Sequence, residues 1–272
     1  MTLTGSVRLR LQFLGTGTSF GVPQIGCDCE VCRSDDPRDK RLRSSLWVRG
    51  EAVSIVIDTT PDFRYQCLRA DVDRVDAIFF THHHADHFFG LDDARVYNRM
   101  QESVIPVFLP AYMVEQFEQT YAYTLTEWPD GITRPRFELR PIDQQEYRKL
   151  VFDEISVIPV IVNHGADEIN GYVIETARSK VAYLTDCKTL PPATVELVQG
   201  ADVVILGALW NRDWQHPAHL NLAGARELAA ELQGAQTWLT HLSHHMGLHA
   251  ETNKLLSDGV QLAHDGLVLE VE

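Results

Sequence analysis

Four side chains that can bind a metal ion lie within six residues: His82, His84, Asp86 and His87. They follow the mainly apolar segment 77–81, which is predicted to be a β-strand. Because the end of a strand opens into a loop, several side chains there can turn toward one point. Imidazole nitrogens and a carboxylate oxygen suit zinc, manganese or iron. The segment therefore predicts part of a metal site.

Further candidate ligands follow other apolar segments of the chain. His164, Asp186 and His241 each stand directly after a predicted strand or within a residue or two of one, and Asp58 does the same. Functional side chains commonly lie on loops at one edge of a sheet. Without Asp58, the set has five imidazoles and two carboxylates, more than the three protein ligands of one catalytic zinc. It suits two ions about 3.5–4 Å apart that share a carboxylate.

The elements that would hold these side chains alternate between short apolar strands and helices. Strands are predicted at 8–14, 53–57, 76–81, 105–109, 155–162, 172–175, 181–185, 203–206, 237–240 and 267–271. Helices are predicted at 62–70, 110–123 and 222–232. The segment 128–148 is predicted to be an insertion of loop and short strands. Because no linker or repeat divides the pattern, it predicts a single α/β domain over residues 1–272.

Composition and charge limit the function classes. The 272 residues are 44% hydrophobic and 23% charged, which is typical of a soluble globular protein. The net charge of −14 argues against a broad surface for long nucleic acids. Met1–Arg10 has no apolar signal-peptide core, and no segment approaches the roughly 18 apolar residues of a membrane span. We therefore expect a cytoplasmic protein with no membrane partner.

Three of the five cysteines, Cys27, Cys29 and Cys32, fall within six positions. In a reducing cytosol this spacing favours metal binding over disulfides. Cys67 is predicted to pack in the core on its helix, and Cys187 to be a buried thiol.

The motif His82-x-His84-x-Asp86-His87, followed by His164, Asp186 and His241, resembles the metallo-β-lactamase superfamily. The resemblance implies an α/β fold, the αβ/βα sandwich, in which two mixed sheets are flanked by helices and the metals lie at one edge. It implies one ion on His82, His84 and His164, a second on Asp86, His87 and His241, and Asp186 as the bridge. It also implies that Asp58 braces the histidine loop, for which the alternative is a helix N-cap or turn residue.

A second resemblance narrows the family. Gly26-Cys27-Asp28-Cys29-Glu30-Val31-Cys32, together with Thr240-His241-Leu242-Ser243-His244, is similar to PhnP-like cyclic phosphodiesterases related to phosphoribosyl 1,2-cyclic phosphate phosphodiesterase. The resemblance implies a structural zinc on Cys27, Cys29, Cys32 and His244, held by a loop at about 21–45 that we call the zinc knot. Thiolates and one imidazole fill the four positions of such an ion.

The resemblance implies the chemistry of the site. A metal-bridging hydroxide would attack small cyclic or nucleotide-like phosphodiesters, such as phosphoribosyl 1,2-cyclic phosphate or 2′,3′-cyclic nucleotides. Two divalent ions, manganese, zinc or iron, would leave the site with a net charge of about +1 and draw in an anionic substrate. The predicted catalytic residues are Asp86 and His219, with His219 stabilising the phosphate or protonating the leaving group. His216 is the nearby competitor for that role.

Several alternatives stay open. A tRNA 3′-processing endonuclease shares the ligand motif, but the chain has no long Lys/Arg- and Gly-rich arm to grip tRNA. A thioester or lactam hydrolase of the same fold is another enzyme class, and a zinc-knot relative without catalysis is the non-enzyme reading. A homodimer is an expectation from the family alone.

The remaining basic and histidine side chains have no predicted ligand role. The basic segment 38–43 is either a solvated loop or a contact for a terminal phosphate of the substrate. His83, His245, His249 and His264 match no ligand position and are predicted to lie on the surface or behind the ligands.

Overall fold

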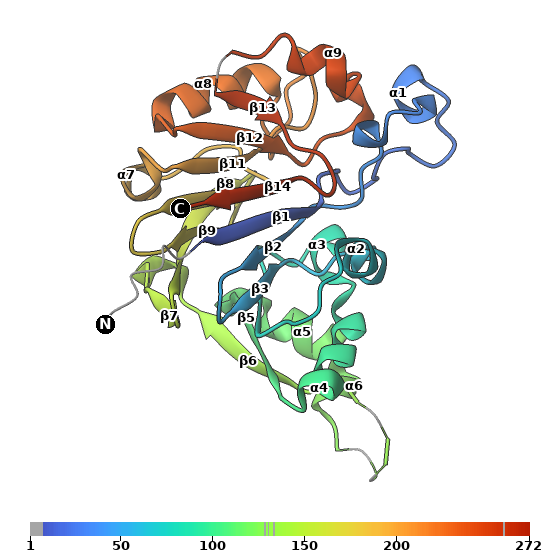
Figure 1. The fold of residues 1–272 in the computed structure, drawn as a ribbon, viewed down its shortest axis with the longest axis vertical. Coiled ribbons are helices and arrows are strands. Elements are labelled where there is room, and N and C mark those ends of the chain that lie inside the picture. The colour runs from blue at the N-terminus through green and yellow to red at the C-terminus, as the bar shows by residue number, and fades with distance from the viewer. Residues whose placement is uncertain (1–7, 128, 130, 133, 258) are drawn as a thin grey trace.

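A computed structural model describes residues 8–127, 129, 131–132, 134–257 and 259–272. Residues 1–7 of the predicted domain and Trp128, Asp130 and Thr133 of the predicted insertion lie outside the described residues. The rest forms two seven-stranded sheets that face each other, with helices on the outer side of each (Figure 1). This is the αβ/βα sandwich that the ligand motif predicted, so the predicted fold class is confirmed.

The first sheet has the order β14-β1-β2-β3-β4-β5-β6. Its strands are β1 (Leu9–Gly15), β2 (Ser45–Arg49), β3 (Ser54–Ile57), β4 (Ala77–Phe79), β5 (Ile105–Pro110), β6 (Phe137–Ile142) and β14 (Val268–Val271). Strands β3 to β6 run parallel, whereas β14, β1, β2 and β3 pair antiparallel. The parallel strands β3 and β4 therefore end at the same edge of the sheet.

The second sheet has the order β13-β12-β11-β10-β9-β8-β7. Its strands are β7 (Leu150–Phe152), β8 (Ile155–His164), β9 (Asp167–Glu175), β10 (Lys180–Leu184), β11 (Val203–Gly207), β12 (Gln236–Thr240) and β13 (Val260–Leu262). Strands β10 to β13 are parallel, and β7 to β10 are antiparallel. Because β8 runs antiparallel to β9, and β9 to β10, the carboxyl end of β8 lies at the same edge as those of β10 and β12.

The longer helices cover the outer faces of the two sheets (Figure 1). The α-helices are α1 (Glu30–Arg33), α2 (Phe63–Ala70), α3 (Ala85–Phe88), α4 (Arg95–Gln101), α5 (Val114–Thr120), α6 (Ala122–Leu125), α7 (Pro192–Val198), α8 (Leu222–Leu232) and α9 (His249–Asn253). The 3-10 helices are η1 (Pro37–Asp39), η2 (Leu91–Ala94), η3 (Ala111–Met113), η4 (Gln144–Glu146) and η5 (His244–Met246). Helix α1 and its loops project beside α9 (Figure 1).

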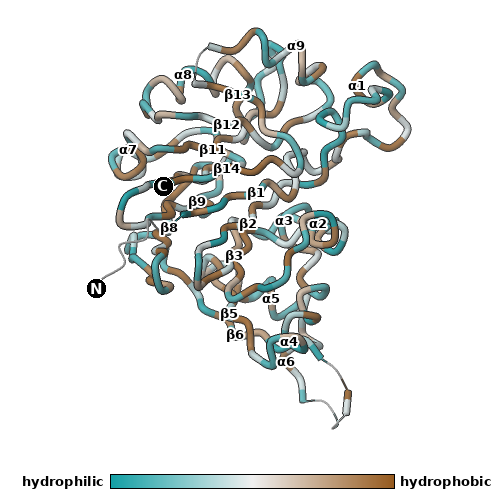
Figure 2. Tube along the Cα trace, viewed as in Figure 1, coloured by the Kyte–Doolittle hydropathy of each residue, from teal (hydrophilic) through white to brown (hydrophobic). Residues whose placement is uncertain are grey.

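Three apolar clusters hold the layers together. The cluster between the sheets includes Leu11, Ile57, Phe79 and Tyr172. The other two lie between each sheet and its helices. Figure 2 shows the same distribution, with apolar residues along the central strands. The hydroxyl of Tyr172 donates a hydrogen bond to the carbonyl of Phe80, which ties the second sheet to the end of β4.

Some predicted elements differ from the observed ones. The predicted helix 110–123 is wrong as a single helix. Pro110 is the last residue of β5 and pairs with Ile142 of β6, and the helical segment is interrupted at Tyr121, between α5 and α6. The hydroxyl of Tyr121 donates to the carbonyl of Phe88 at 2.6 Å, so packing overrides the helical pattern there. Strand β9 also begins at Asp167, earlier than predicted, and β2 was not predicted.

Within the described ranges, no helix combines the length and the apolar character that crossing a lipid bilayer requires.

Candidate metal centre

The seven predicted metal ligands meet at one edge of the sandwich. His82 follows β4, and His164 is the last residue of β8. Asp186 follows β10, and His241 follows β12 directly. His84, Asp86 and His87 lie at or within the short helix α3, which continues the loop after β4. Strand ends that are far apart in the sequence thus deliver their side chains to one place.

Three residues of this edge have backbone angles that favour glycine. Asp58, Asp186 and His241 have φ values of 64°, 53° and 59°. Left-handed backbone is uncommon for residues other than glycine, although Asp, Asn and His adopt it more often than most. Each of the three stands where a strand turns sharply into a loop. The side chains of Asp186 and His241 contact the ligand cluster, and that of Asp58 contacts His87.

The first ligand group consists of His82, His84 and His164, whose candidate ligand atoms lie within 4.8 Å of one another. His82 Nε2 and His84 Nδ1 are 2.9 Å apart. His164 Nδ1 is 2.8 Å from the carbonyl oxygen of Asp186 and 3.1 Å from that of Ala218. Those backbone contacts occupy Nδ1, so Nε2 of His164 is the nitrogen left for an ion.

The second ligand group consists of Asp86, His87 and His241. Asp86 Oδ2 is 3.3 Å from His87 Nε2 and 3.5 Å from His241 Nε2. Asp186 lies between the groups, with Oδ1 3.4 Å from His87 Nε2 and Oδ2 3.9 Å from His82 Nε2. A carboxylate in this position can serve two ions at once, as a bridging ligand must.

Unpaired nitrogen atoms test whether the residues fit metal ions. His87 Nε2 and both ring nitrogens of His241 are buried, and none of them has a hydrogen-bond partner among the residues that the structure describes. Leaving such atoms unpaired costs about 1–3 kcal/mol each. The two Nε2 atoms face the Asp86 and Asp186 carboxylates, and this donor set of imidazoles and carboxylates suits divalent ions. The residues therefore fit a metal centre.

Charge in the cluster is unevenly distributed. Burial by itself lowers the pKa of His87, but the carboxylates of Asp186, Asp86 and Asp58 raise it well above its ordinary value. Burial lowers the pKa of His82 well below its ordinary value, which keeps that ring neutral. Metal ligation requires a neutral imidazole, so an ion binding at His87 would displace a proton.

Asp58 supports the histidine loop from behind. Its carboxylate accepts hydrogen bonds from the Thr81 amide at 2.8 Å and the Thr81 hydroxyl at 2.9 Å, and it lies 2.7 Å from His87 Nδ1. The side chain is completely buried, and burial raises its pKa. Holding Nδ1 of His87 in this way leaves Nε2 directed at the candidate ion.

Replacing Asp58 with asparagine is expected to weaken metal affinity about 10- to 100-fold. Asparagine tolerates the left-handed backbone, but its amide cannot accept all three contacts. Metal titration monitored by calorimetry would measure the change. Asp153→Asn is the matched control, because Asp153 is exposed and also has a positive φ, 46°. Equal affinity in Asp58→Asn and wild type would refute the bracing role.

The predicted zinc-knot side chains also converge. Sγ atoms of Cys27, Cys29 and Cys32 lie 3.2, 3.4 and 3.5 Å from His244 Nδ1. The donor set of three thiols and one imidazole matches that of a closed tetrahedral zinc site. His244 is three residues from His241, so one loop supplies both groups of ligands.

His219 lies against the centre, and His216 lies behind it. The His219 ring stacks on His241 with centroids 5.0 Å apart, and its Nδ1 is 4.0 Å from Asp186 Oδ2. Burial lowers the pKa of His219 to about 3. The His216 ring packs on His219 at 4.7 Å, and its Nδ1 accepts a hydrogen bond from the Ala218 amide at 3.1 Å. Of the two rings, His219 is therefore nearer to the ligands.

The basic segment 38–43 was predicted to be either a solvated loop or a contact for a substrate phosphate. The structure shows that it is not solvated throughout. Arg41 is buried, and its guanidinium donates to the carbonyl of Ala263 and the hydroxyl of Thr16. His249, predicted to lie on the surface or behind the ligands, is buried beside Arg41 at 3.2 Å. Arg38 pairs with Asp36. These charges are engaged within the chain, and they hold the last part of the zinc knot against the rest of the fold.

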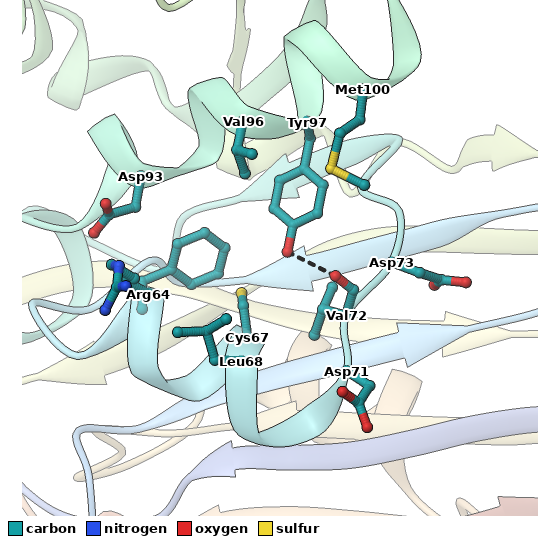
Figure 3. Close-up of a pocket in the computed structure, with 11 residues that line it drawn as sticks. Arg64, Cys67, Leu68, Asp71, Val72, Asp73, Asp93, Val96, Tyr97 and Met100 are labelled. Carbon is teal, nitrogen blue, oxygen red and sulfur yellow. Dashed lines mark hydrogen bonds between the residues drawn. The ribbon is translucent and has the colours of Figure 1, made fainter.

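Of two pockets in the structure, one lies away from the candidate metal centre and one lies beside it. A pocket of about 480 Å³ lies between α2 and α4, where Figure 3 shows the Tyr97 hydroxyl bonded to the Val72 carbonyl. Burial raises the pKa of the Cys67 thiol there to about 12, so this thiol is a poor nucleophile. None of the predicted ligands lines this pocket. A smaller pocket is lined by His219 and His244 and thus adjoins both candidate sites.

The smaller pocket contains residues that the sequence analysis missed. Phe20, Trp210 and Trp214 line it. The signal that could have revealed them is the placement of two tryptophans a few residues before His216 and His219, in a loop of otherwise polar residues.

Comparisons with known proteins agree with this geometry. A family model described as a beta-lactamase superfamily domain matches residues 54–242. A solved structure described as a new diphosphatase from the PhnP family is 39% identical, covers 97% of both chains and superposes with a TM-score of 0.87.

Two curated relatives have different names. An octanoyltransferase from Porphyromonas gingivalis is 34% identical over 260 residues, which is 95% of this chain. The chain spans only 51% of the length of that relative. A ribonuclease Z from Anoxybacillus flavithermus is 24% identical over 286 residues, 86% of this chain and 87% of that protein.

Proposed function

Since this chain belongs to the beta-lactamase superfamily and has its metallo-hydrolase fold, we propose that it hydrolyses small anionic phosphodiesters with two divalent ions. The observation that carries the proposal is the arrangement of two ligand groups around one shared carboxylate, Asp186. A single catalytic zinc needs only three protein ligands. The second group would be superfluous for one ion.

The chain's residues would hold the ions and position the substrate. His82, His84 and His164 would hold one ion, Asp86, His87 and His241 the other, and Asp186 would contact both. When bound, such ions polarise phosphoryl oxygens and lower the pKa of water. Because only Asp86 and Asp186 contribute negative charge among the ligands, the loaded site stays positive and attracts an anion.

His219 would contact the phosphate or the leaving oxygen. Its ring lies between the ligands and the smaller pocket, so a substrate that enters the pocket meets it before it reaches Asp186. A hydrogen bond from the N–H of a fixed, neutral imidazole can stabilise the negative charge that develops on oxygen. His216 is less suited, because it packs on the His219 ring, and it is Nδ1 of His219 that lies 4.0 Å from Asp186 Oδ2.

Replacing His219 with alanine is expected to lower turnover about a hundredfold, with both metals retained. His216→Ala is the matched control and should have a much smaller effect on kcat. Steady-state kinetics with metal analysis of each variant would measure the difference. Full activity in His219→Ala, or an equal loss in both variants, would remove the assignment to His219.

A diphosphate bond is the second candidate substrate bond. The solved relative with 39% identity is described as a diphosphatase, and its likeness covers nearly the whole chain. A diphosphate presents the same phosphoryl oxygens to two ions as a phosphodiester does, so the ligand geometry suits both.

A substrate panel with metal analysis would test the proposal. The compounds are bis-p-nitrophenyl phosphate, 2′,3′-cyclic nucleotides, phosphoribosyl cyclic phosphate, a nucleoside diphosphate ester, an octanoyl thioester and a tRNA precursor. We expect turnover of one or more small phosphate compounds and two ions per chain beside the structural zinc. Turnover of the thioester alone, or of the tRNA precursor with a steep salt dependence, would replace the proposal with one of those activities.

A further inference from the structure

The smaller pocket has a volume of about 290 Å³ and opens between three loops. One loop follows β1, one precedes α8, and the third follows β12. The lining residues are Thr18, Ser19, Phe20, Gly21, Gln24, Leu209, Trp210, Trp214, His216, His219, Ser243, His244 and His245. The amide of Thr18 donates to the carbonyl of Leu242 at 3.2 Å, which joins the first loop to the third. The pocket therefore lies beside the candidate centre and beside the zinc knot.

Large aromatic side chains in this pocket are exposed. Phe20 is 66% exposed and Trp214 is 51% exposed. Exposed aromatic surface collected in a concave site, instead of scattered over the protein, indicates a binding function. Aromatic rings of this kind bind other flat rings by offset stacking or edge contact.

The wall that carries Trp214 is held in place by ring contacts. The Trp210 indole donates to the carbonyl of Trp214 at 3.1 Å, and the two rings pack edge to face at 5.4 Å. The His216 ring packs on the rings of Trp210 and His219, with centroid distances of 5.7 Å and 4.7 Å. On the other side, His245 packs on Trp214 at 4.9 Å. The aromatic wall thus runs from the pocket to the ring that touches the metal ligands.

We propose that this pocket binds a planar aromatic ring of the substrate, the base of a mononucleotide, against Phe20 and Trp214. The phosphate of the same molecule would lie toward His219 and the metal ligands, so the inference rests in this respect on the proposed function. Ser19 and Gln24 line the same space, and residues of these types can offer hydrogen-bonding groups to the edge of a base.

Size and charge favour a mononucleotide over a longer nucleic acid. Ligand pockets for small molecules usually measure about 300–1,000 Å³, so this pocket suits a compact ligand. None of its lining residues that the structure describes is lysine or arginine. Binding to a polynucleotide depends on such cations along the backbone, whereas one stacked base does not.

The test compares binding of AMP and ribose 5-phosphate to the metal-loaded full chain by calorimetry. The two ligands share the phosphate and the sugar, and only AMP has a base. Stacking of one base corresponds to about 5- to 150-fold in affinity. We expect AMP to bind more tightly by a factor in that range. Trp214→Ala and Phe20→Ala should each reduce the preference, and Trp214→Phe should keep most of it.

Tyr65→Ala is the matched control, because Tyr65 is 59% exposed and does not line the pocket. Equal affinities of wild type for AMP and ribose 5-phosphate would overturn the inference, as would an unchanged preference in both alanine variants. A clear preference for AMP without turnover of any phosphate compound would overturn the proposed function and leave the base-binding pocket supported.

Discussion

Replacing Asp186 with asparagine is expected to lower turnover by about a thousandfold or more and to reduce the metal content of the centre. The Asp186 carboxylate lies between both ligand groups, so the amide would weaken both ions together. Burial opposes ionisation of Asp186, but its interactions with the neighbouring His241 and His87 rings bring its pKa well below its ordinary value. The folded protein is therefore built around this negative charge, which asparagine removes while keeping the side-chain size.

The backbone makes asparagine the informative substitution at this position. Asp186 has a φ of 53°, and asparagine tolerates left-handed backbone at least as well as aspartate does. Asp71→Asn is the matched control, because Asp71 has a φ of 52° at the end of α2 and is exposed. Turnover and metal content would be measured for both variants. If Asp186→Asn keeps two ions and wild-type turnover, the shared-carboxylate model is wrong.

Replacing Cys29 with serine is expected to remove one zinc ion per chain and to lower the melting temperature by about 10 °C. An ion bound at a thousand times its Kd stabilises the folded state by about 4 kcal/mol. For a chain of this size, each kcal/mol corresponds to about 2–4 °C. The loss should be local at first, since the apolar clusters of the two sheets do not depend on the zinc knot.

Metal analysis and calorimetric melting would test this expectation. Cys67→Ser is the matched control, because Cys67 lies on α2 outside the cysteine cluster and should leave the zinc content unchanged. An unchanged zinc content in Cys29→Ser would exclude Cys29 as a zinc ligand. A lost zinc ion with an unchanged melting temperature would show that the ion does not stabilise the fold.

The zinc knot has a second consequence for the smaller pocket. The backbone amide nitrogen of Gln24 lies 3.4 Å from the Cys32 Sγ and can donate a hydrogen bond to it. Gln24 also lines the pocket. Lys40 donates to the Cys32 carbonyl at 3.0 Å, which connects the basic segment to the same cluster. A zinc ion at these cysteines would therefore order one wall of the proposed base-binding pocket, although the cysteine site is separate from the candidate metal centre.

Local patterns predicted some elements well and failed at others. The helix at 222–232 was predicted with the observed bounds, because its apolar spacing agrees with an N-cap in which Asn221 accepts from the Gly224 amide at 2.9 Å. Strand β2 was not predicted, because Leu46, Trp47 and Val48 are buried on both faces and show no alternation. The helix predicted at 110–123 failed because the contact of Tyr121 with Phe88 decides the backbone there.

The sequence by itself determined the residue types of the site and their local grouping. Four candidate ligands within 82–87 and three cysteines within 27–32 are close in space because they are close in the chain. The family resemblance implied which distant ligands join them, and only the tertiary structure decided how their side chains lie. Asp186 lies between the two ligand groups, Asp58 lies behind His87, and Trp214 lies in the pocket beside His219. These juxtapositions depend on strand order and register, which arise from contacts across the whole chain and leave no mark in local spacing.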